Sequence, residues 1–372
     1  MTAAPHPRPA EVTRARRLDL HTSWLRLTFQ SDQWADFHYA WLWQLADGHR
    51  HPLTRERQVG PADVPADIAP RVALITPRDT LFIEWSDGLN ADYSLYELHA
   101  QAYATQRPLP TPPPSDLAPV TLALAGSIAA WAPAVSNFLA RHGVCIVRAR
   151  GDADAATPEA TEAWISALKT QGLEPRATHF GRIEDLRPDN TTNQNTDQLG
   201  YTQAAVDLHT DQPFLEHPPR YQLLHCIVPA ASGGDSTVAD ALVASQYLRA
   251  TDHETWRWLS EVPVRFHRKQ KAFEAIVDAP IFGLSPDGRF IVRDSYFTFA
   301  PLALPFEQQA GWRRAYTRYT DLVRSPGHHR TTRLEAGDVL IYDNHRMLHA
   351  RTAFSGHRWL RGVYFDPQGA PA

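Results

Sequence analysis

A proline-rich run divides this chain of 372 residues. Residues 107–114 read RPLPTPPP, and no helix or central strand is expected to pass through them, because proline lacks the backbone N–H that both structures use. Such a run favours an extended polyproline conformation and acts as a semi-rigid linker. We therefore predict an N-terminal domain over residues 1–106, a linker over 107–118 and a larger domain over 119–372.

The N-terminal part contains several segments that are typical of strands. Residues 23–29 and 37–42 are rich in aromatic and apolar side chains, which favour extended structure. Residues 72–76 and 81–85 flank the turn sequence PRDT at 77–80 and predict a hairpin. The sequence therefore predicts a small β-rich domain at the N-terminus.

The larger part mixes strands with a few helices. Helices are expected over residues 127–139, 157–172 and 254–259, and from 312 onward. Strands are expected over residues 144–147, 221–228, 281–284, 290–292, 339–342 and 358–365. This pattern predicts an α+β fold that is mainly β, and a double-stranded β-helix (jelly roll) with flanking helices fits it best.

Composition argues against several classes of protein. The formal net charge of -4 lacks the basic surplus of nucleic-acid binders. No apolar run of membrane-spanning length occurs, and the first residues do not resemble a secretion signal. Cys145 and Cys226 lie in apolar runs, so we expect buried thiols and no disulfide framework. We expect a soluble, cytoplasmic protein that binds neither nucleic acid nor a membrane.

A histidine and an aspartate stand two positions apart, at His209 and Asp211. On an extended strand both side chains project from one face, although the pattern alone also fits a polar strand end where the carboxylate orients the histidine. A third ligand can come from His349, from His345 or from the pair 328–329, and spacing does not choose between them. Two histidines and one carboxylate suit non-haem Fe(II) in oxygenases, because the opposite positions stay free for cosubstrate and O2.

Two arginines and a serine are candidates for binding a small diacid. Arg358 and Arg361 lie in the last strand-like segment, where a guanidinium can grip a carboxylate with two parallel hydrogen bonds. Each also fits a solvated strand edge. Ser236 follows a Gly-Gly turn and can support the same carboxylate, although the turn alone would explain it.

Taken together, these segments resemble the γ-butyrobetaine hydroxylase family. That family includes trimethyllysine dioxygenase and belongs to the wider group of taurine dioxygenase-like Fe(II)/2-oxoglutarate enzymes. The matching segments are GYT at 200–202, HTD at 209–211, GGDS at 233–236, DNHRMLHAR at 343–351 and the RxLxGxY pattern at 358–364. The resemblance covers most of residues 120–367 and reaches FHYAWL at 37–42.

The resemblance implies an iron site and a reaction. It implies that His209, Asp211 and His349 bind Fe(II), which favours His349 over His345. The protein is then expected to consume 2-oxoglutarate and O2, to release succinate and CO2, and to hydroxylate an unactivated C–H bond. It also implies that the N-terminal domain serves in dimer contacts, so a homodimer is expected.

For the cosubstrate, the resemblance implies that Arg358 binds the distal carboxylate of 2-oxoglutarate, with Ser236 as support. It gives Arg361 no such role. One departure concerns zinc: relatives often carry a Cys-rich zinc site after the first aromatic segment. Residues 43–51 contain no Cys, and zinc needs thiolates or several histidines. We therefore predict that the N-terminal domain has no structural zinc.

A second departure concerns the substrate. The family binds a trimethylammonium group in an aromatic cage, and the matching positions here are Phe180, Glu184, Tyr201 and Tyr364. Glu184 stands where the family has Trp. A carboxylate attracts any cation but adds hydrogen bonds only when the cation carries N–H groups. We expect a small cationic substrate that is betaine-, amine- or amino-acid-like, with an amine, guanidinium or partly methylated amine preferred.

Two other classes of function remain open from the sequence. One is a zinc hydrolase that uses the same His/Asp/His set around an activated water. The other is a non-catalytic module that binds a metal or a small molecule on the same fold. Succinate formation that depends on substrate, iron and O2 separates the dioxygenase from both.

Overall fold

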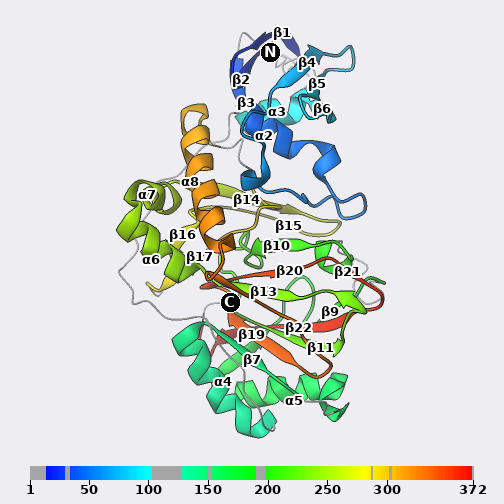
Figure 1. Cartoon of the computed structure of the whole chain (residues 1–372), viewed down its shortest axis with the longest axis vertical. Helices are drawn as coiled ribbons and strands as arrows, with labels where there is room; N and C mark the ends of the chain where they lie inside the picture. Colours follow the sequence, from blue (N-terminus) through cyan, green and yellow to red (C-terminus); the bar gives the residue numbers. More distant parts are fainter. Residues whose placement is uncertain are drawn as a thin grey trace, which may run out of the picture.

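The computed structural model describes residues 14–29, 34–102, 128–149, 153–189, 198–285, 288–300 and 304–370. The linker expected over 107–118 lies outside the described residues, so the division into domains stays a prediction. Figure 1 shows the described N-terminal elements at one end of the molecule and the large sheets beyond them. No helix within the described ranges combines the length and the apolar character needed to cross a bilayer.

The N-terminal unit, residues 14–102 as described, consists of two antiparallel three-stranded sheets with short helices. One sheet contains β1 (Ala15–Leu20), β2 (Trp24–Phe29) and β3 (Trp34–His38), and the other contains β4 (Pro70–Ile75), β5 (Thr80–Trp85) and β6 (Asn90–Ser94). The helices are α2 (Tyr39–Leu45), α3 (Leu95–Ala102), η1 (Asp47–His49) and η2 (Pro61–Asp63). The hairpin expected around residue 78 is confirmed as β4–β5.

The strand expected over 37–42 was wrong beyond His38, where the chain turns into α2. Tyr39, Trp41, Leu42 and Trp43 are all buried. A run of apolar residues that is buried on successive positions shows neither a period of two nor a clear helical period, so its pattern cannot separate strand from helix. The surrounding structure decides the conformation here.

Two antiparallel sheets form the centre of the remaining chain. The larger sheet has the order β7 (Val144–Val147), β19 (Val339–Asp343), β11 (Tyr221–Val228), β22 (Trp359–Pro367) and β8 (Leu173–Arg176), with β9 (Glu184–Leu186) also pairing with β22. The smaller sheet has the order β10 (Val206–His209), β20 (Met347–Arg351), β13 (Ser236–Asp240) and β18 (His329–Thr332). The chain crosses between the sheets from β10 to β11 and from β19 to β20. This arrangement is the expected jelly roll.

Helices cover the outer face of the larger sheet. They are α4 (Ile128–His142) and α5 (Pro158–Lys169), and α5 begins as expected, with Thr157 accepting a hydrogen bond from the Ala160 N–H and a proline in the first turn. Along β11, Leu223 packs outward with these helices and Leu224 packs inward between the sheets. Both faces are therefore covered, which explains why β11 is buried along almost its whole length.

The other described elements lie mostly beside the smaller sheet and the N-terminal unit (Figure 1), and one of them, the turn η3 (Ala153–Ala156), lies instead beside α5 and β11. They are the helices α6 (Ala241–Thr251), α7 (His253–Glu261) and α8 (Phe306–Arg324), the hairpins β14 (Val264–Lys269) with β15 (Glu274–Ala279) and β16 (Phe282–Leu284) with β17 (Phe290–Val292), the pair β12 (Ser232–Gly233) with β21 (Phe354–Ser355), and the turns η3 (Ala153–Ala156) and η4 (Leu199–Tyr201).

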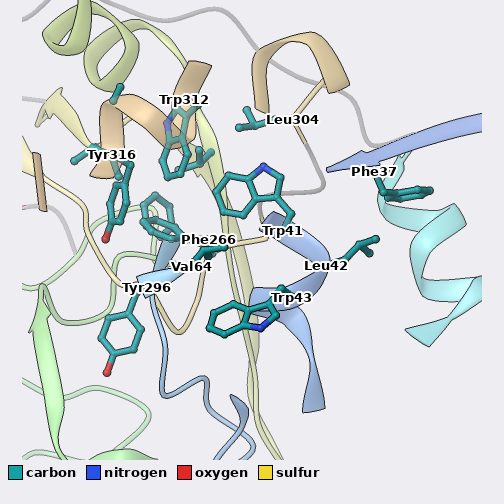
Figure 2. Packing of buried hydrophobic residues seen from close by; sticks show 14 of the residues in the cluster. Phe37, Trp41, Leu42, Trp43, Val64, Phe266, Tyr296, Leu304, Trp312 and Tyr316 are labelled. Carbon is teal, nitrogen blue, oxygen red and sulfur yellow. The ribbon is translucent and has the colours of Figure 1, made fainter. Parts of the chain in front are cut away.

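One hydrophobic cluster joins the N-terminal unit to the jelly roll. The indole of Trp41 from α2 lies with its ring centroid 5.8 Å from that of Trp312 on α8, and Figure 2 shows these two rings close to Phe266 of β14 and Val64. All four side chains are buried in the same cluster. The N-terminal unit therefore packs directly on the elements that flank the smaller sheet.

Candidate metal centre and its pocket

Three potential metal ligands meet at the inner face of the smaller sheet. His209 on β10 lies opposite His349 on β20 in the strand register, and the two ring centroids are 4.1 Å apart. Oδ1 of Asp211 lies 3.6 Å from Nε2 of His209 and 3.8 Å from Nε2 of His349. Among the residues that the structure describes, this is the one group of three His, Cys, Asp or Glu side chains whose ligand atoms all lie within 4.8 Å of one another.

Asp211 reaches this position without being part of the strand. β10 ends at His209, so the expected strand geometry does not place the aspartate. Instead, the amide of Asn344 holds its backbone: the Asp211 N–H donates to Oδ1 of Asn344 at 2.8 Å, and Nδ2 of Asn344 donates to the Asp211 carbonyl at 3.0 Å. Asn344 lies in the turn between β19 and β20. The carboxylate is therefore positioned from the strand that leads to His349.

Two of the three ligands, His209 and Asp211, are also oriented by a second contact. Nδ1 of His209 lies 2.8 Å from the Asp207 carbonyl, so this nitrogen carries the proton and Nε2 presents its lone pair to the centre. The hydroxyl of Tyr364 donates to Oδ2 of Asp211 at 3.0 Å, which leaves Oδ1 facing the two histidines. These contacts direct one imidazole nitrogen and one carboxylate oxygen toward the space that they share with His349.

The electrostatics of the group favour metal binding. Burial lowers the pKa of His349 to about 3, and the neighbouring His209 adds to this effect, so His349 is neutral and has a lone pair to give. Burial alone would raise the pKa of Asp211, but the neighbouring histidines and the hydrogen bond from the Tyr364 hydroxyl outweigh it and leave that pKa below its usual value. An ionised carboxylate beside a neutral imidazole is the form that binds a cation.

The other histidines considered from the sequence lie elsewhere. Nε2 of His345 lies 2.9 Å from the Pro218 carbonyl, in the turn before β20. Nδ1 of His328 lies 2.9 Å from the Ser325 hydroxyl. The geometry therefore brings His349, and not these residues, beside His209.

The three ligands open into a cavity of about 100 Å³ between the sheets. Arg358 and Ser236 both line it and are buried. Arg358, only 5% exposed, forms no ion pair or hydrogen bond with another described residue, and burial lowers its pKa to about 10. Gly234, at a φ of +73°, lets the chain pass this guanidinium, because a Cβ there would lie 3.3 Å from Nε of Arg358. Arg358 is thus a buried cation that faces a cavity.

Arg361 has a different environment. Its guanidinium lies 3.3 Å from Oδ1 of Asp185 and donates to the Pro158 carbonyl at 2.9 Å. It does not line the cavity. The two arginines of this strand therefore differ in environment, and only Arg358 faces the cavity.

Three of the four residues expected at the substrate line the cavity. Phe180, Glu184 and Tyr364 line it, whereas Tyr201 lies behind Glu184. Glu184 is 4% exposed, and its Oε1 accepts hydrogen bonds from the Tyr201 hydroxyl at 2.8 Å and from the Gln198 amide. Its other oxygen, Oε2, has no hydrogen-bond partner among the described residues. The hydroxyl of Tyr364 is hydrogen-bonded to Asp211, so this residue contributes only its ring to the cavity wall.

Several residues of the site were missed from the sequence. Glu56, Arg268 and Arg351 line the cavity, and Asn344 positions a ligand. Arg351 and Asn344 stand inside the motif around His349, where a systematic search for polar neighbours could have found them. Glu56 lies about 150 residues before His209 in the sequence, and no local pattern marks it.

Comparisons with known proteins show the family of the chain. Residues 110–364 match the sequence model described as "Taurine catabolism dioxygenase TauD, TfdA family". The chain is 30% identical over 347 residues to a γ-butyrobetaine dioxygenase of Pseudomonas sp. (strain AK-1), covering 85% of this chain and 83% of that protein. It is 25% identical over 332 residues to the mitochondrial trimethyllysine dioxygenase of Gallus gallus (84% and 75% covered). A γ-butyrobetaine dioxygenase of Homo sapiens is 29% identical over 188 residues (46% and 47% covered).

Proposed function

The chain belongs to the TauD/TfdA family of Fe(II)- and 2-oxoglutarate-dependent dioxygenases, and we propose that His209, Asp211 and His349 bind its iron. Two neutral imidazoles and one carboxylate on one side of the ion leave the opposite positions free for cosubstrate and O2. Iron, 2-oxoglutarate and O2 together supply the oxidation that hydroxylates a substrate carbon, with succinate and CO2 released. The family membership favours this activity over the zinc hydrolase and the non-catalytic module.

We propose that Arg358 binds the distal carboxylate of 2-oxoglutarate, with Ser236 beside it. The observation that carries this assignment is a buried guanidinium that has no anionic partner among the described residues and faces the same cavity as the three ligands. A buried charge needs a partner, and a carboxylate suits the guanidinium fork. The cosubstrate would then be held at one end by Arg358 and at the other near His209 and His349.

For the substrate we propose a small cation that carries N–H groups and contacts Glu184. The relatives are named for γ-butyrobetaine and trimethyllysine, which supports a cationic class. Oε1 of Glu184 is fixed by Tyr201 and Gln198, whereas Oε2 is free of described partners and can accept an N–H. Phe180 and the ring of Tyr364 supply apolar wall beside it.

A matched series of substrates tests this proposal. γ-Butyrobetaine, 4-(dimethylamino)butyrate, 4-aminobutyrate and 4-guanidinobutyrate differ in the number of N–H groups on one carbon skeleton. Succinate release should require Fe(II), O2 and a substrate, and it should be faster with the N–H donors than with γ-butyrobetaine. The variant Asp211→Ala should release no succinate. A preference for the trimethylammonium compound would contradict the role of Glu184 and leave the iron chemistry intact.

We also infer the division at residues 107–118, a cytoplasmic location and a homodimer. Cys145 and Cys226 are free and buried, as is common in reducing compartments. Light scattering of the purified chain tests the oligomeric state directly. A monomer mass at micromolar concentration would contradict the homodimer.

A further inference from the structure

We propose that Glu56, contributed by the N-terminal unit, is a positioning residue for the substrate side of the pocket. This inference rests on the proposed function and deepens it, because it assigns part of substrate selection to a residue outside the jelly roll. Glu56 is 5% exposed and lines the cavity. It lies in the segment between η1 and η2, far from every iron ligand in the sequence.

Glu56 joins two separate segments of the pocket wall. Its Oε1 accepts a hydrogen bond from the guanidinium of Arg268 on β14. Its Oε2 accepts a hydrogen bond from the backbone N–H of Leu199, the first residue of η4. Both oxygens are therefore engaged, each by a different element. A buried carboxylate with two such donors fixes their spacing.

The turn η4 belongs to neither sheet. Its position therefore depends on hydrogen bonds from side chains. Arg351 holds it from the other side, donating to the carbonyls of Leu199 (3.3 Å), Gly200 (3.2 Å), Thr202 (2.9 Å) and Ala204 (2.5 Å). Arg351 stands two residues after His349 on β20. The turn is thus clamped between a strand that carries an iron ligand and a residue of the N-terminal unit.

The clamped turn carries both partners of Glu184. Gln198 directly precedes η4 and Tyr201 ends it, and both donate to Oε1 of Glu184. A shift of η4 would therefore move the donors that orient this carboxylate. The contacts of Arg358 and of the iron ligands do not pass through η4, so the cosubstrate side of the pocket is held independently.

The test compares Glu56→Ala and Glu56→Gln with the wild type in succinate release, using the most active member of the 4-aminobutyrate series. Glu56→Ala should raise the KM for substrate about tenfold or more, since it leaves the buried Leu199 N–H without its acceptor. Glu56→Gln should give a smaller rise, because an amide oxygen still accepts from Leu199. The KM for 2-oxoglutarate should stay within about twofold of wild type in both variants, because neither change touches the cosubstrate contacts.

Asp36→Asn is the matched control. It weakens an ion pair with Arg26 inside the N-terminal unit (2.6 Å) and touches no residue of the cavity, so it should change stability and leave both KM values as they are. An unchanged substrate KM in folded Glu56→Gln and Glu56→Ala would overturn the proposal, as would an equal rise in the KM for 2-oxoglutarate. If Glu56→Ala fails to fold, Glu56→Gln alone decides by the same criterion. A wild type that forms no succinate with any member of the series contradicts the proposed function instead.

Discussion

The hydroxyl of Tyr364 donates a hydrogen bond to Oδ2 of Asp211 at 3.0 Å. Resemblance alone places this tyrosine at the substrate, yet its polar atom is directed at a proposed iron ligand. By occupying one carboxylate oxygen, it leaves Oδ1 as the atom that faces His209 and His349. Residues that orient metal ligands in this way commonly tune the affinity for the metal.

Tyr364→Phe should therefore weaken iron binding about 10-fold to 100-fold. The change removes the donor and keeps the ring in the wall. Titration of the apoprotein with Fe(II) under anaerobic conditions, or with Co(II) followed by absorbance, measures the effect. Tyr342→Phe is the matched control, because the Tyr342 hydroxyl donates to Gln222 and not to a proposed ligand. Equal metal affinity in Tyr364→Phe and wild type would contradict the role given to the phenol.

The two histidines of the β19–β20 region should respond differently to substitution. His349→Ala should abolish specific Fe(II) binding and succinate release, because it removes one of three ligands. His345→Ala loses only the contact with the Pro218 carbonyl and should keep the metal, at a cost in stability of about 1 kcal/mol. Metal titration together with thermal unfolding measures both. Loss of metal in His345→Ala with His349→Ala unaffected would reverse the assignment.

Arg358→Met should raise the KM for 2-oxoglutarate about 100-fold, since it removes the cation proposed to pair with the distal carboxylate in a buried site. Arg361→Met removes a guanidinium of similar size that contacts Asp185 and the Pro158 carbonyl. It should lower stability and leave that KM near the wild-type value. Steady-state kinetics with varied 2-oxoglutarate separates the two variants, and a larger effect at Arg361 would contradict the assignment.

Affinity for a cationic substrate should rise with pH because of Glu184. Burial raises the pKa of this carboxyl to about 8; the charge of Asp211 raises it further, while the hydrogen bonds from Tyr201 and Gln198 and the charge of Arg268 lower it. Below pH 8 the carboxyl is mostly neutral, so a cation must displace its proton, and affinity falls about tenfold for each pH unit. Above pH 8 the charged form dominates and affinity levels off.

4-Guanidinobutyrate is the probe for this pH dependence, because a guanidinium stays charged across the range. Its KM, measured between pH 6 and 9 at saturating 2-oxoglutarate, should fall toward pH 8 and then remain constant. Glu184→Gln should show a flat profile with weaker binding throughout, since its amide does not titrate. A wild-type KM that is constant over this range would contradict contact between Glu184 and the cation.

Much of the fold could be predicted from local sequence signals, because several segments adopt the conformation that their neighbouring residues favour. The cap at Thr157, the hairpin β4–β5 and the apolar strand β11 each follow from a few neighbouring residues, and all three are confirmed. The strand prediction was wrong from Tyr39 to Leu42, because most of these residues are buried by contacts with distant elements. Such contacts leave no periodic pattern in the segment itself.

The same distinction between local signals and distant contacts applies to the residues of the site. His209 and Asp211 stand in one short motif, so the sequence identifies them as a pair. The choice of His349 over His345 depends on the register of β10 with β20, which spacing alone does not contain. Glu56 belongs to the site only because the N-terminal unit packs against β14 and η4, and that contact is a property of the folded chain.

The hydrophobic cluster that runs from Trp41 to Trp312 has a practical consequence for anyone who dissects this enzyme. Cutting the gene at the proline-rich run would leave each half with an apolar surface that its counterpart normally covers. Neither product should stay folded and soluble by itself. Replacing the first hundred residues with those of a relative would change buried side chains as well as the N-terminal unit. Engineering of substrate range should therefore keep the two parts together as one folding unit.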